Sequence, residues 1–229
     1  MDASIAVSSQ QQVQRRFGLS IAALSLVFGG ALLAHFVQTS GGVQLRDVRF
    51  QGTGGLTMSA LLYVPPNATP DTPAPGVLAV HGYINSRETQ SPYAIELARR
   101  GYVVLALDQT GHGYSSPPSF ANGYGGPDGL TYLRGLDIVD KSQIVLEGHS
   151  MGGWASLIAA GAQRDAYRSI VVSGSSTGTL GAPDGDATFP RNLGLVVARF
   201  DEFSGLMWGA AIARDVVSTS KLKKLFGTE

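Results

Sequence analysis

Four continuous apolar runs, separated by segments with helical spacing, limit the folds that this chain can adopt. The runs are "GVLAV" (76–80), "YVVLAL" (102–107), "QIVLE" (143–147) and "SIVVS" (169–173). Strands without polar alternation are buried on both faces, as in a parallel sheet covered by helices. The intervening segments "SPYAIELARR", "DGLTYLRGLDIVD" and "MGGWASLIAAGA" have the apolar spacing of helices. We therefore expect an α/β fold with a mostly parallel sheet and helices on both faces.

Further strands flank this core pattern. The segments "LRDVRF" (45–50) and "LTMSALLYV" (56–64) read as an antiparallel pair ahead of the main sheet. The segment "LGLVVARF" (193–200) predicts one more strand after the fourth run. Between the second and third runs, the glycine-rich segment 109–127 predicts a loop that walls the site.

The N-terminal part of the chain is a separate piece. Residues 17–37 form an apolar run that follows Arg15 and Arg16, and about 20 residues is the length that a helix needs to cross a bilayer. We expect a cytoplasmic segment at 1–16, a transmembrane helix or signal anchor at 17–37, and an exported domain at 43–229, because positive charge favours the cytoplasmic side. A cleaved signal peptide is the alternative.

Composition excludes several kinds of site. The 17 Lys and Arg residues balance the 17 Asp and Glu residues, so nothing indicates a nucleic-acid partner. The chain has no cysteine, which excludes disulfides, thiolate metal sites and a cysteine nucleophile. The four histidines form no metal-binding spacing, so we expect no metal and no cofactor.

The segment "LEGHSMGGWASL" carries the strongest chemical signal. Ser150 lies between Gly148 and Gly152, with an apolar strand before it and a helix after it. A strand that turns directly into a helix strains the residue at the turn, and glycines let neighbouring backbone crowd it. The Ser150 hydroxyl would then project from the carboxyl end of the sheet, where free N–H groups of the helix stabilise an oxyanion.

Three motifs in this order resemble the α/β-hydrolase family: "HGY" after one strand, "DQTGHGYS" after the next, and "GHSMGG" after the third. The resemblance covers residues 45–203. It implies that Ser150 is the nucleophile of a serine esterase or peptidase-like enzyme, and that the backbone N–H groups of Met151 and Tyr83 form the oxyanion hole. The implied substrate is a small-molecule carboxylic ester, thioester or amide, attacked through an acyl-enzyme without a cofactor.

The family also implies a carboxylate after a late strand. Asp201 follows "LGLVVARF" and is the expected acid, while Asp184 and Asp186 are the alternatives. A helix N-cap is the structural role that Asp201 could have instead.

The sequence lacks a histidine at the place that the family implies. His81 and His112 are expected to hold loops, and His149 to line the pocket; no histidine follows His149 in the printed sequence. Three interpretations stay open: a C-terminally incomplete domain at 43–229, a base from another chain, or a non-catalytic membrane-tethered binding domain. Each leaves the fold as predicted and puts the activity in question.

Overall fold

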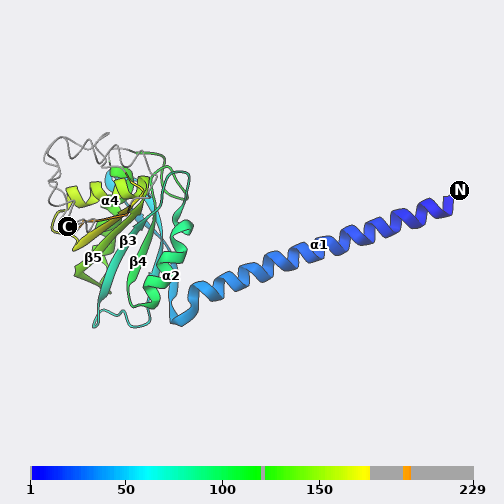
Figure 1. Cartoon of the computed structure of the whole chain (residues 1–229), viewed down its shortest axis with the longest axis horizontal. Helices are drawn as coiled ribbons and strands as arrows, with labels where there is room; N and C mark the ends of the chain where they lie inside the picture. The colour runs from blue at the N-terminus through cyan, green and yellow to red at the C-terminus, as the bar shows by residue number, and fades with distance from the viewer. Residues whose placement is uncertain (1, 120–121, 176–192, 197–229) are drawn as a thin grey trace, which may run out of the picture. The chain divides into compact units, whose positions relative to one another are not determined.

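The computed structural model describes residues 2–119, 122–175 and 193–196. The chain divides into two compact units, Met1–Ser40 and Gly41–Glu229. Figure 1 shows the helix of the first unit and the sheet of the second. The two units are described separately below.

The first unit consists of one long helix, α1 (Asp2–Thr39). The segment Gln11–Gly42 contains an 18-residue stretch with a mean hydropathy of 2.1 and is long and apolar enough to cross a membrane. Its large side chains are exposed, among them Leu26 and Phe28, so this segment is not the core helix of a soluble domain. A signal sequence near the N-terminus can meet the same criteria of length and composition.

Within the described residues, the second unit is built on a seven-stranded sheet of order β1-β2-β4-β3-β5-β6-β7. The β1–β2 and β2–β4 pairs are antiparallel, and the pairs from β4 through β7 are parallel. This arrangement confirms the predicted sheet and its antiparallel start. The strands are β1 (Gln44–Gln51), β2 (Thr57–Val64), β3 (Ala74–Val80), β4 (Val103–Asp108), β5 (Val139–His149), β6 (Ser169–Ser173) and β7 (Leu193–Val196).

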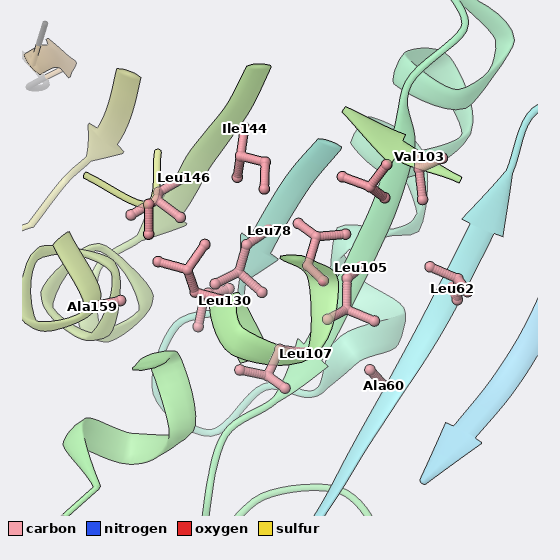
Figure 2. Close-up of a cluster of buried hydrophobic side chains, with 14 of the residues drawn as sticks. Ala60, Leu62, Leu78, Val103, Leu105, Leu107, Leu130, Ile144, Leu146 and Ala159 are labelled. Atoms are coloured by element: carbon pink, nitrogen blue, oxygen red, sulfur yellow. The ribbon is translucent and has the colours of Figure 1, made fainter. Parts of the chain in front are cut away.

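Helices cover both faces of the sheet. They are α2 (Ser91–Arg99), α3 (Gly126–Gly135) and α4 (Met151–Ala162), with short 3₁₀ turns η1 (Ser40–Gly42), η2 (Thr53–Gly55), η3 (Arg87–Gln90) and η4 (Gly123–Gly125). Successive strand residues point to opposite faces. The side chains of Leu78, Leu105 and Leu146 therefore join the core formed with α3 and α4, which Figure 2 shows. Val77 and Val104 join a second core with α2.

The predicted helix over 128–140 is too long at its C-terminal end. Helix α3 ends at Gly135, and β5 begins at Val139, whose Cα pairs with that of Ala74 on β3. Leu136 is already extended, with φ −79° and ψ 128°. Glycine weakens a helix, and the β-branched residues Ile138 and Val139 favour a strand. The helix therefore ends here, although the apolar spacing of a helix continues.

Candidate active site

The candidate site lies where three neighbouring strands end. Strands β4, β3 and β5 are adjacent and parallel, so their carboxyl ends lie at the same edge of the sheet. They end at Asp108, Val80 and His149. The three motifs of the sequence follow these positions and are therefore gathered at one edge, the usual place for ligands in an open α/β sheet.

Ser150 occupies a strained turn between β5 and α4. Its backbone has φ 53° and ψ −120°, which a non-glycine residue adopts only where the surroundings enforce it. Its N–H donates to the Ser173 carbonyl at 2.8 Å, and its own carbonyl accepts from Trp154 N–H at 3.3 Å. Ser150 is half-buried at this turn, so the predicted strand–turn–helix geometry is present.

The two glycines beside Ser150 are required by close backbone packing. A Cβ atom on Gly148 would overlap the backbone of Gly152, and one on Gly152 would overlap the carbonyls of Val80 and His81. The packing of Gly152 brings the start of α4 against the end of β3. It thus fixes the serine turn relative to the "HGY" turn.

The "HGY" turn lies beside the serine. A Cβ atom built on Gly82 would be 3.4 Å from the Cβ atom of Ser150. Met151 is the first residue of α4, where a helix leaves its N–H groups without intrahelical acceptors. These positions agree with an oxyanion hole formed by Met151 and Tyr83, although the convergence of those two N–H groups remains a prediction.

His81 is a buried structural residue. Its Nδ1 lies 2.7 Å from the Gly82 carbonyl, and its Nε2 accepts from the Gln109 backbone N–H at 3.1 Å. This pattern corresponds to a neutral ring protonated at Nδ1. Burial lowers the pKa of His81, which favours the same neutral form. The ring therefore ties the "HGY" turn to the loop after β4, as expected.

The other two histidines of the second unit lie near this turn. The His112 ring contacts the rings of His81 and Tyr83 edge to face, with centroids 5.2 Å and 5.8 Å apart. His149 is exposed, and its Nδ1 lies 3.2 Å from Ser173 Oγ. His112 thus contacts the loops as predicted. No described contact gives His149 a role as base.

An ionic cluster of three buried residues, Arg87, Asp108 and Ser59, and the exposed Asp47 supports the loops of the site. The Arg87 guanidinium is 4% exposed and donates to both carboxylate oxygens of Asp47, at 2.8 and 3.0 Å. It also donates to Ser59 Oγ at 2.8 Å, and its Nε lies 3.5 Å from Asp108 Oδ2. Hydrogen bonding to Arg87 lowers the pKa of Asp47.

Asp108 connects this cluster to the backbone of two loops. Its carboxylate accepts hydrogen bonds from the backbone N–H groups of Arg87, at 2.8 Å, and Tyr114, at 3.1 Å. It also accepts one from the Ser59 hydroxyl at 3.0 Å. A charged group buried in this way needs such partners. Sequence analysis had missed the cluster, because nothing in the spacing of Arg87 and Asp108 shows that they meet.

Glu147 is a second feature that sequence analysis had missed. It lies on β5 three residues before Ser150, in an otherwise apolar run. Its Oε2 atom is buried and has no hydrogen-bond partner among the described residues. Burial raises the pKa of Glu147 to about 7. A glutamate inside a strand expected to be buried on both faces was the signal that could have found it.

We predict that Glu147→Gln stabilises the protein at high pH. The folded state holds the Glu147 proton up to a pKa of about 7, whereas the unfolded chain loses it near 4.5. Stability should therefore fall as pH rises from about 4.5 to 7, and at pH 8 the variant should gain about 3 kcal/mol. Urea unfolding at pH 5 and pH 8 measures this. Asp71→Asn on an exposed turn is the control, and equal gains at both pH values would contradict the prediction.

Several predicted site residues lie outside the described part of the chain. These are the acid Asp201 and its alternatives Asp184 and Asp186. Strand β7, which precedes Asp201, is described only as Leu193–Val196. Among the described residues, no group of three or more His, Asp or Glu side chains could hold a metal ion.

Comparisons with known proteins agree with this fold. The model of the alpha/beta hydrolase fold matches residues 75–227. Dipeptidyl peptidase 8 of Homo sapiens is 29% identical over 143 residues, covering 55% of this chain and 16% of that protein. 2-(Acetamidomethylene)succinate hydrolase of Mesorhizobium japonicum is 34% identical over 99 residues, covering 43% of this chain and 34% of that protein.

Solved structures share the same architecture. A hypothetical protein of Pseudomonas aeruginosa superposes with a TM-score of 0.53 at 26% identity, covering 59% of this chain and 44% of that one. Dipeptidyl peptidase 4 of Porphyromonas gingivalis gives 0.59 at 16% identity, covering 75% and 30%; this likeness concerns the fold alone. The chain belongs to the α/β-hydrolase fold family. It spans about a third or less of the curated relatives described above.

Proposed function

We propose that this chain is a serine hydrolase that cleaves a carboxylic ester, thioester or amide through a Ser150 acyl-enzyme. The observation that carries the proposal is the strained Ser150 turn at the start of α4, packed through Gly152 against the end of β3. Such a turn costs free energy, and a serine nucleophile in this fold requires that geometry. The hydrolases among the relatives support the same reaction class.

The proposed roles follow from the positions at the sheet edge. Ser150 Oγ attacks the carbonyl carbon, and the N–H groups of Met151 and Tyr83 donate to the oxygen that becomes negative. Collapse of the tetrahedral intermediate expels the alcohol, thiol or amine, and water then releases the acid product. We assign Asp201 to the orientation of a histidine base. The four histidines of the printed sequence all precede Ser150. Experiment must therefore identify the base.

A non-catalytic binding domain is the second candidate, favoured by the absence of a histidine between Ser150 and Glu229. General-base assistance contributes about 10²–10⁴-fold. We therefore expect the printed chain to hydrolyse p-nitrophenyl acetate slowly, with Ser150→Ala changing the residual rate little. Fast turnover abolished by Ser150→Ala would contradict the missing base. The variants His112→Ala and His149→Ala would then show which ring acts.

We also propose that residues 17–37 anchor the protein in a membrane, with the hydrolase domain on the extracytoplasmic side. The apolar, exposed surface of α1 supports this, as do the arginines before it. Deleting residues 1–40 should move the protein from the membrane fraction to the soluble fraction. A full-length product that stays soluble while retaining its N-terminus, as identified by mass spectrometry, would exclude the anchor.

A further inference from the structure

Ile84, two residues after Gly82, has an unusual backbone conformation. Its φ is 60°, and the other described non-glycine residues with positive φ are Tyr124 and Ser150. A β-branched side chain in this left-handed region is a genuine outlier. Strain of this kind persists only when the surrounding structure enforces it, and it is concentrated at active sites and ligand clamps.

Packing of its own side chain does not account for this conformation. The Ile84 side chain is 82% exposed and the neighbouring Tyr83 is 67% exposed. Neither residue contributes to either hydrophobic core. An isoleucine held in strain and facing water gains nothing for the stability of the fold, where asparagine or glycine would adopt the same backbone more easily.

The position of Tyr83 and Ile84 in the fold indicates a function for them. Gly82, directly before Tyr83, packs against Ser150, with a built Cβ atom 3.4 Å from the Ser150 Cβ atom. The Tyr83 ring is held edge to face by His112, with centroids 5.8 Å apart. Tyr83 and Ile84 therefore belong to the turn that packs beside Ser150, and the Tyr83 ring contacts the His112 ring.

We propose that Tyr83 and Ile84 form an apolar subsite that binds the hydrocarbon group next to the reacting carbonyl of the substrate. The substrate class is then an ester, thioester or amide with an aliphatic or aromatic group at this place, and not a charged one. The position of this group next to a reacting carbonyl rests on the proposed function. The binding of a hydrocarbon group to Tyr83 and Ile84 does not.

The test measures binding without catalysis. Isothermal titration with 2-butanone and 2-heptanone is performed on the full chain in lipid nanodiscs, with empty nanodiscs subtracted. Wild type should bind 2-heptanone about tenfold or more tightly, because each buried methylene is worth up to about fourfold in affinity. The variants Ile84→Asn and Ile84→Gly should reduce this preference to about threefold or less. The apolar variant Ile84→Leu should keep it.

Two further measurements on the same samples make the result specific. Urea unfolding should show a higher midpoint for Ile84→Asn and Ile84→Gly than for Ile84→Leu, because both residues adopt positive φ more easily. Equal affinity of wild type for the two ketones, or a preference kept by both Asn and Gly variants, would overturn the subsite.

Labelling by ethyl fluorophosphonate reports separately on Ser150. Loss of the ketone preference in Ile84→Asn and Ile84→Gly, with no Ser150 adduct in wild type even with added imidazole, would keep the subsite and reject the proposed reaction. An adduct together with an unchanged preference in both variants would reject the subsite and keep the reaction.

Discussion

Replacing Arg87 by methionine should lower the free energy of unfolding by about 3–5 kcal/mol. The guanidinium is almost fully buried and donates to Asp47, Ser59 and the Ala60 carbonyl. Methionine fills a similar volume but leaves the fully buried Asp108 carboxylate without its cation. The cost is dominated by this uncompensated charge, and urea unfolding at pH 7 measures it.

Arg49→Met is the matched control for this experiment. Arg49 also donates to Asp47, and its guanidinium also lies over the Tyr114 ring, at 5.0 Å against 5.1 Å for Arg87. Its side chain, however, is 40% exposed, and exposed ion pairs contribute about 0–1 kcal/mol. Similar losses in the two variants would show that burial of the cluster is not what makes Arg87 important.

The loss of Arg87 should also affect the site. Arg87 and Asp108 connect η3, which follows the "HGY" turn, to the end of β4 and to the Tyr114 backbone. The "HGY" turn, which precedes η3, lies beside the serine turn. We expect Arg87→Met to slow any reaction at Ser150, whereas Arg49→Met should leave that rate nearly unchanged.

The parts of the fold that follow from local patterns could be predicted from the sequence. Continuous apolar runs gave the parallel strands, and the glycines around Ser150 gave the strained turn, because close backbone packing leaves no room for a side chain there. The end of α3 could not be placed, since helical spacing continued past Gly135 while pairing of Val139 with β3 decided the outcome.

The features that could not be predicted from the sequence depend on residues that are far apart along the chain. Arg87 and Asp47 are 40 residues apart, and their hydrogen bonds depend on the antiparallel pairing of β1 with β2 and on the loop after β3. The strain at Ile84 is likewise a property of the folded turn, because isoleucine in a loop carries no sequence signal for positive φ. Glu147 was visible in its apolar run, but its burial required the neighbouring strands.

The central claim is that Ser150 is a nucleophile held ready at the edge of the sheet. The direct measurement is covalent labelling by a fluorophosphonate, followed by mass spectrometry of the peptide that contains Ser150, with and without added imidazole. A free base should raise the labelling rate, because it replaces the general base that a serine needs.

Ser150→Ala and urea-unfolded wild type are the controls for this measurement. The account predicts an adduct on Ser150 in folded protein, accelerated by imidazole and absent from both controls. Folded protein that gives no adduct on Ser150 even with imidazole, or that labels no faster than the unfolded chain, would contradict the claim.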